Sequence, residues 1–403
     1  MAGEYQENFD TRPIANFVLS CYLDQKLIPW QNINGITIRE YIYDIIPRVE
    51  LQFQDNGMFV EMNPILEGQE LKIVVKLNAE QNDIINQKFE VIGSRHQPTN
   101  PERTDQYTVT VTAAFKPSIF MGPLENRFYP RKKFSEVISE IGSLISVSTD
   151  IRLDTKDKMT WYQPNQNYMD FINDSLNRCN PGEDDTPFCY SGRDGKLVLT
   201  SLRTELDQDS GIVIMNDPQN SLNATIDKNN KYFYTHAYGD NSGFFNKRIA
   251  YGIKYSYNDG TNIQVKEIAD YKSTKLSGYK NKNKNLNKGA VEYRNFGFLN
   301  NVYDQYFDSI VRNEFIRTSF LSSPLTVNAQ PGSYELFQKI DIQIRSQNIP
   351  NTIVQSYSGT YLIGGIIHHM SKKATYDMVL VLFRDGIDDS KTYDKFKNTL
   401  EKS

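Results

Sequence analysis

The 403-residue sequence has few residues of the kinds that build metal sites or disulfide frameworks. It contains three cysteines, Cys21, Cys179 and Cys189, and four histidines. Cys179 and Cys189 flank a short polar loop, but no second pair of Cys or His residues has the spacing that would complete a zinc site. We therefore expect free thiols, as in proteins made in a reducing compartment.

Known catalytic motifs are also missing. The sequence has no P-loop, no dinucleotide-binding glycine fingerprint, no His-Glu-x-x-His and no G-x-S-x-G elbow. His368 and His369 are adjacent on a predicted strand, so their side chains point to opposite faces and cannot bind one ion together. Glu136 and Glu140 lie on the polar face of a predicted helix, where charges are normally solvated. We expect a protein that is not an enzyme and has no catalytic residue, metal site or cofactor.

Neither charge nor hydropathy favours nucleic acid or a membrane as a partner. The 45 Lys and Arg residues against 49 Asp and Glu give a net charge of −4, which produces no positive field. No apolar run approaches the ~18 residues of a membrane span, and the first residues lack the pattern of a secretory signal. We expect no membrane anchor and no specific nucleic-acid binding.

The chain is instead rich in aromatic residues and short apolar segments. Its 25 Tyr and 22 Phe favour β structure and large interfaces. Residues 336–345 alternate apolar and polar side chains, which predicts a half-buried strand, and residues 359–370 with 375–384 predict a hairpin of buried strands.

The same three-strand order occurs near the front of the chain, at residues 71–77, 88–93 and 107–115. Gly93 and Gly364 are 271 residues apart, and Phe115 and Phe383 are 268 apart. The near-constant spacing predicts that one β-module is used twice.

The remaining segments complete a mainly β fold with an α+β insertion, built on two tube-like antiparallel β-barrels related by internal duplication. Strands are predicted at 14–23, 35–43, 49–53 and 59–62, and helical periodicity begins at Phe134, Tyr168 and Val302. The predicted division is a first tube-like β-barrel at 1–118, an α/β insertion at 119–217, a second tube-like β-barrel at 218–240 and 321–386, a second part of the insertion with a long helix at 241–320, and a C-terminal tail at 387–403.

The two predicted barrels differ in their surroundings. Val109, Val111 and Ala113 alternate with threonines, so one face of the first barrel meets water or a water-filled lumen. Residues 378–383 are apolar throughout, which is typical of a strand that is covered on both faces. We expect the second barrel to pack against the insertion or a neighbouring subunit. The Lys- and Asn-rich segment 278–289 predicts a solvated loop.

Several phrases resemble a known family. Residues 49–55 and 67–75, the hairpin 89–115, the helices at 165–178 and 302–320, and the hairpin 361–383 resemble the central baseplate hub subunit of T-even-type contractile-tailed bacteriophages. The chain is more distantly similar to the N-terminal part of type VI secretion spike proteins. Those proteins continue into a β-helix, whereas this chain ends at Ser403, so we expect the spike to be a separate polypeptide.

The resemblance implies a structural protein that forms a homotrimer. Six barrels from three chains would make a pseudo-sixfold ring that adapts a hexameric tail tube to a trimeric central spike protein, with tape-measure and baseplate wedge proteins as further candidate partners. The location implied is the tail baseplate of the virion, after assembly in the host cytoplasm. Strand residues that leave the barrel cores should line the lumen or contact neighbours: Lys72, Val74, Lys76, Asp341, Gln343 and Arg345.

Two other functions fit parts of the pattern. A receptor- or carbohydrate-binding tail protein would use the abundant tyrosines to stack on sugars and would not require two equivalent barrels. A cell-wall-degrading enzyme would need two carboxylates converging about 5–9.5 Å apart in one cleft.

Overall fold

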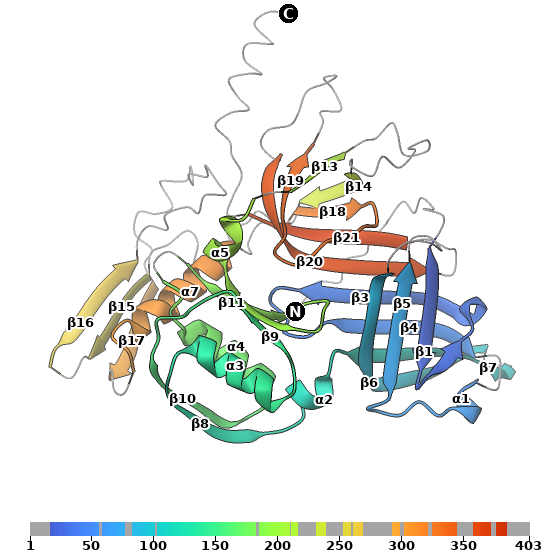
Figure 1. Ribbon diagram of the computed structural model, residues 1–403, viewed down its shortest axis with the longest axis horizontal. Coiled ribbons are helices and arrows are strands. Elements are labelled where there is room, and N and C mark those ends of the chain that lie inside the picture. Colours follow the sequence, from blue (N-terminus) through green and yellow to red (C-terminus); the bar gives the residue numbers. More distant parts are fainter. Residues whose placement is uncertain are drawn as a thin grey trace, which may run out of the picture.

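Two β-units of this chain share one 13-stranded sheet, and an α/β insertion packs beside them (Figure 1). The computed structural model describes residues 17–55, 59–76, 83–100, 103–182, 185–209, 211–216, 231–238, 253–258, 261–268, 292–298, 302–320, 325–344, 358–371 and 376–384. The segment 278–289, the tail at 387–403 and Arg345 lie outside these residues.

The first β-unit is an arc of seven strands in the order β3-β4-β7-β6-β5-β1-β2. Its strands alternate as predicted, because Leu71, Ile73 and Val75 are fully buried while Lys72 and Val74 are only half-buried. The strands are β1 (Val18–Leu23), β2 (Lys26–Ile28), β3 (Ile33–Tyr41), β4 (Arg48–Asp55), β5 (Glu70–Lys76), β6 (Asp83–Asn100) and β7 (Arg103–Ala114), with a 3-10 turn at Trp30–Asn32.

The strand predicted at 59–62 is wrong. These residues form the short helix α1 (Phe59–Met62). The Asp55 carboxylate accepts hydrogen bonds from the backbone N–H groups of Phe59 and Val60, at 3.1 and 2.9 Å. A carboxylate that binds the first free N–H groups of a turn stabilises a helix start, and this local interaction outweighs the β-preference of Phe59 and Val60.

The second β-unit is a closed six-stranded barrel in the order β19-β13-β14-β18-β21-β20, completed by the pairing of β19 with β20. Its strands are β13 (Ile212–Asn216), β14 (Lys231–Tyr238), β18 (Leu325–Ala329), β19 (Lys339–Gln343), β20 (Gly359–Ser371) and β21 (Tyr376–Phe383). Because β13 joins this barrel, the pairing favours starting the second unit near Ile212 rather than at 218.

The internal duplication is visible in the strand order. The order β3-β4-β7-β6-β5-β1 of the first unit corresponds to β14-β18-β21-β20-β19-β13 of the second. One difference is direction, since β1 is antiparallel to β5 whereas β13 is parallel to β19. The mainly β class with a duplicated unit is thereby confirmed.

The two units also share irregularities of register. A β-bulge interrupts β6·β7 between Val91 and Gly93, and an equivalent one interrupts β20·β21 between Ile363 and Gly365. A second shared shift lies after Ile33 in β3·β4 and after Phe233 in β14·β18. Gly93 therefore corresponds to Gly365, one residue beyond the sequence-based match.

The insertion between β7 and β13 combines helices with two small sheets, and the helices predicted from Phe134 and Tyr168 are confirmed. Asn167 caps α4 by accepting a hydrogen bond from the Asp170 N–H at 2.8 Å. The elements are α2 (Pro117–Phe120), β8 (Glu125–Lys132), α3 (Phe134–Leu144), β9 (Thr149–Ile151), β10 (Met159–Gln166), α4 (Tyr168–Arg178), β11 (Pro187–Ser191), β12 (Leu197–Ser201) and α5 (Leu202–Leu206).

A second excursion separates β14 from β18 and contains β15 (Ile253–Asn258), β16 (Ile263–Ile268), β17 (Glu292–Phe298) and α7 (Tyr306–Phe320). The long helix predicted from Val302 is thus present. It packs along α4, where the Asn313 Nδ2 donates to the carbonyl oxygens of Leu176, Asn177 and Cys179. These bonds satisfy carbonyl groups that the end of α4 leaves without helical partners.

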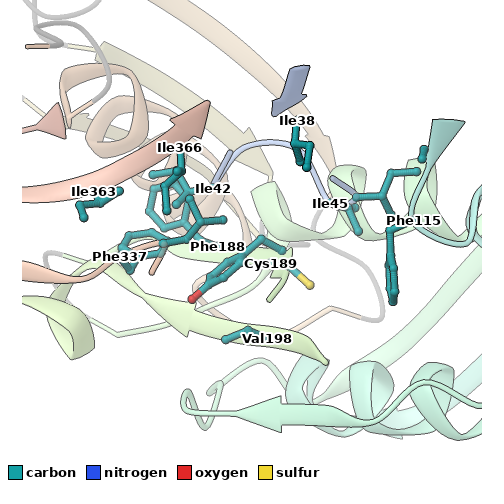
Figure 2. Packing of buried hydrophobic residues seen from close by; sticks show 14 of the residues in the cluster. Ile38, Ile42, Ile45, Phe115, Phe188, Cys189, Val198, Phe337, Ile363 and Ile366 are labelled. Carbon is teal, nitrogen blue, oxygen red and sulfur yellow. The ribbon is translucent and has the colours of Figure 1, made fainter. Parts of the chain in front are cut away.

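The second unit is covered on its outer side by the insertion, as its apolar strands predicted. Figure 2 shows Phe188 of β11 beside Phe337 and Ile363 of the second unit, and Ile42 of the first unit beside Ile366. The Phe188 and Phe337 rings are 4.9 Å apart at their centroids. All five residues belong to one hydrophobic core that runs through both units and the insertion. The three cysteines are free and buried.

Candidate functional site

The two β-units meet at a strand-to-strand junction, which we call the seam. Residues 365–371 of β20 pair antiparallel with residues 35–41 of β3, in a register that places His368 opposite Ile38 and His369 opposite Thr37. The seam joins the two β-units into one continuous sheet. It fixes their relative position through backbone pairing rather than through a linker.

Two consecutive glycines allow the strands to approach at one end of the seam. A Cβ on Gly365 would lie 2.5 Å from Cδ1 of Tyr41, and a Cβ on Gly364 would overlap the ring of Phe383. Both glycines sit at the bulge of β20. A bulge lined by residues without side chains lets aromatic rings from both units pack directly onto the backbone.

A buried polar network lies on the core side of the seam and involves all three parts of the chain. Arg193, from the turn between β11 and β12, donates from Nε to both carboxylate oxygens of Glu40 on β3, at 3.3 Å each. Its Nη2 lies 2.7 Å from Nε2 of His368 on β20. The Nδ1 of His368 lies 2.8 Å from Oη of Tyr376 on β21.

The geometry fixes the protonation of His368. A guanidinium can only donate, so Nε2 accepts and the proton is on Nδ1, which donates to Tyr376. Burial, followed by the charge of Arg193, holds the pKa of His368 well below its ordinary value. For Glu40, burial raises the pKa and the nearby Arg193 opposes this rise. The imidazole is therefore neutral, and the Arg193–Glu40 pair carries the charges of the network.

This arrangement suits a network that holds the two units and the insertion together better than it suits a catalytic centre. The side chains of Glu40 and His368 are 3% and 0% exposed, so substrate has no access to them. A hollow of about 490 Å³ adjoins the Arg193 turn, lined by charges of both signs that include Glu70, Lys88 and Asp194. Across the described ranges, no three His, Cys, Asp or Glu residues come together as metal ligands.

The residues predicted to line a lumen or contact neighbours occupy matching positions of the two units. Lys72, Val74 and Lys76 are half-buried on β5 and alternate with core residues, as Asp341 and Gln343 do on the equivalent strand β19. Asp341 accepts a hydrogen bond from the Thr360 hydroxyl at 2.7 Å. Their assignment to a lumen or an interface remains a prediction.

The sheet face turned away from the cores is polar across the seam. One cross-strand row runs from Thr112 through Glu50, Thr37 and His369 to Asp377, and none of these residues is buried. The adjacent row on the core side, Val111, Leu51, Ile36, Met370 and Tyr376, is fully buried. This row of polar residues therefore continues from one unit to the other, and His368 and His369 point to opposite faces as predicted.

The sequence contained one signal for the network that our reading missed. Ile36 and Ile38 share one face of β3, and Glu40 occupies the same face. A carboxylate in a core register needs a partner. Arg193 carries no comparable signal, because it lies in an ordinary Gly-Arg-Asp-Gly turn.

Comparisons with known proteins yield matches of structure only. No protein-family model matches the chain, and no curated protein matches it by sequence. Among the helices described here, none has the length and apolarity to cross a membrane.

The structural matches extend over nearly the whole chain. A 43 kDa tail protein of prophage MuSo2 from Shewanella oneidensis matches with a TM-score of 0.60 and 10% identity, covering 93% of this chain and 100% of that one. A tail protein from Neisseria meningitidis MC58 matches with a TM-score of 0.58 and 8% identity, covering 93% and 98%. The resemblance inferred from the sequence is thus confirmed at the level of architecture: this chain has the fold of phage tail proteins.

Proposed function

We propose that this protein is a structural hub subunit of a phage tail, located in the virion and assembled in the host cytoplasm. The observation that carries the proposal is the repetition of one strand order in two units that a single seam joins into one sheet. The fold shared with two proteins described as tail proteins supports it. On this proposal the chain is not an enzyme.

The duplication explains how such a subunit would act. Three chains with two similar units each can present six similar positions around a ring, while the ring keeps true threefold symmetry. A ring of this kind would contact a hexameric tail tube on one side and a separate trimeric spike on the other. Tape-measure and baseplate wedge proteins are further proposed neighbours.

The polar face that crosses the seam is the surface we assign to the lumen or to these neighbours. We assign to the same role the half-buried residues Lys72, Val74 and Lys76 on β5 and Asp341 and Gln343 on β19. Half-burial in the single chain leaves these side chains available for contacts in an assembly.

Light scattering and imaging test this proposal. We expect a particle of three times the chain mass of 46.5 kDa, which shows six similar lobes when it is viewed down its axis by negative-stain microscopy. A protein that stays monomeric across the accessible concentration range, or a ring with no sixfold appearance, would argue against the hub.

One exposed feature favours the alternative of carbohydrate binding. Phe128 on β8 and Tyr162 on β10 stack with ring centroids 4.4 Å apart, and they are 64% and 43% exposed. Exposed aromatic faces can pack on the apolar faces of sugars. Glycan-array binding that is lost in the Phe128→Ala variant, by a monomeric protein, would support this function over the hub.

A further inference from the structure

The second half of β6 has an open backbone edge. Strand β5 pairs with β6 only from Asp83 to Glu90, whereas β7 pairs with it from Glu90 to Asn100. Beyond Gly93, no strand in the described part of the chain pairs with the other edge of β6. The side chains from Ser94 to Thr99 are all exposed.

The equivalent edge in the second unit is occupied. His96 lies opposite Val109 on β7, and His368 lies opposite Met378 on β21. Since Val109 and Met378 hold the same position in their units, His96 of the first unit corresponds to His368 of the second. In β20 this edge, from Gly365 to Ser371, is the part that pairs with β3 in the seam. The first unit therefore repeats one half of the seam but leaves it open.

The other half of the seam is repeated in the second unit. Strand β14 is the equivalent of β3, since both pair with matching strands through the same register shift. Strand β13 pairs with β14 only from Lys231 to Phe233. From Thr235 to Tyr238, the described residues place only β18 beside β14.

We infer that β6 of one copy pairs with β14 of a second copy and forms a seam between chains. This inference rests on the proposed function, because repeating the in-chain contact at these two edges, which no other described strand occupies, is what closes three chains into a ring of six units. The contact is head-to-tail, so a closed ring forms when the rotation of the in-chain seam is repeated.

The in-chain seam also fixes the register of the new one. We replace each residue of the in-chain seam by its equivalent in the other unit. The antiparallel register then places four pairs of residues opposite one another: His96 with Tyr238, Gln97 with Ala237, Pro98 with His236, and Thr99 with Thr235. A quasi-equivalent ring repeats this register at each contact between chains.

The chemistry of the new seam differs from that of the in-chain seam. Met370 and Ile36, both fully buried, are replaced at the equivalent positions by Pro98 and His236. Proline has no N–H, so this pair supplies at most one backbone hydrogen bond, and proline at an edge weakens strand pairing there. The seam between chains is therefore the weaker of the two.

Disulfide trapping tests the register directly. In the double variant Gln97→Cys/Ala237→Cys, the two positions lie opposite each other on different chains, within the Cα separation that a disulfide spans. Mild oxidation should give covalent dimers and trimers on non-reducing gels. The off-register variant Gln97→Cys/Thr235→Cys places its cysteines on a diagonal of about 7–8 Å and should stay largely uncrosslinked.

The in-chain seam provides a matched control. Thr37 and His369 hold the positions equivalent to Ala237 and Gln97, so Thr37→Cys/His369→Cys should form a disulfide within one chain, detected by intact mass and thiol titration. The buried native cysteines should remain reduced in all variants.

The outcomes separate the two proposals. Selective crosslinking of the in-register pair between chains supports the inference. A trimer by light scattering in which that pair crosslinks no better than the off-register pair overturns the seam between chains but leaves the hub intact. A monomer whose in-chain control still crosslinks overturns both the hub and the inference.

Discussion

Replacing Arg193 by methionine should destabilise the chain far more than its position in a surface turn suggests. The substitution keeps most of the side-chain volume but removes the cation that, among the described residues, bonds the carboxylate of Glu40 and the Nε2 of His368. Glu40 would then be a 3% exposed charge without a partner. Removing one member of a buried pair typically costs about 3–5 kcal/mol.

The same turn offers a matched control. Asp194 and Lys196 form an ion pair at 2.6 Å, but their side chains are 53% and 48% exposed. Exposed pairs contribute about 0–1 kcal/mol, because water competes for both groups. Lys196→Met should therefore leave the free energy of unfolding nearly unchanged in urea titrations followed by circular dichroism.

A double variant tests the electrostatic reasoning itself. Adding Glu40→Gln to Arg193→Met removes the uncompensated charge, so part of the lost stability should return, and the two changes should be strongly non-additive. If Arg193→Met costs no more than Lys196→Met, or if the two losses simply add, the network does not hold the seam in the way described.

Two further predictions concern the same region. Lowering the pH from 7.5 to 5.5 should destabilise the protein. The pKa of His368 is depressed in the folded state, so over this range the imidazole takes up a proton only in the unfolded state, where its pKa is near the ordinary value of 6.5. Each pH unit below 6.5 then lowers the free energy of unfolding by about 1.4 kcal/mol for one such group. His368→Asn should remove this component from the measured pH dependence, whereas parallel curves for the two proteins would contradict the assignment. Gly365→Ala should lower the free energy of unfolding by about 1–3 kcal/mol, because the added methyl group overlaps the ring of Tyr41. Gly93→Ala is at the equivalent position of the first unit, where a Cβ meets no neighbour within 4 Å, and should change the thermal midpoint little. Equal effects of the two substitutions would refute the packing argument.

Part of the strand pattern was predictable from the sequence, because its cause is local. Alternation such as that of β5 follows from burial of one face of a half-exposed strand. The error at Phe59–Met62 has an equally local cause, since a side-chain cap from Asp55 decides four residues that propensity alone assigns to a strand.

The seam itself was not predictable in the same way. Thr37 and His369, which share a hydrogen bond at 3.0 Å, are 332 residues apart, and strand pairing over that distance leaves no periodicity in either segment. Its traces in the sequence are indirect. Glu40 stands in a core register, and Gly364 and Gly365 remove side chains where two aromatic rings must fit.

Joining the two units in one polypeptide has a consequence for their evolution and stoichiometry. Because both units belong to one polypeptide, every assembly of this chain contains the two kinds of unit in equal numbers, and neither can be exchanged for a second copy of the other. Each unit is therefore free to acquire its own decoration. The first is followed by the helices and sheets of residues 117–206, and the second carries β15, β16, β17 and α7 between two of its strands. In a closed ring, neighbouring units would then have the same strand arrangement but would alternate in the inserted helices and sheets that they carry.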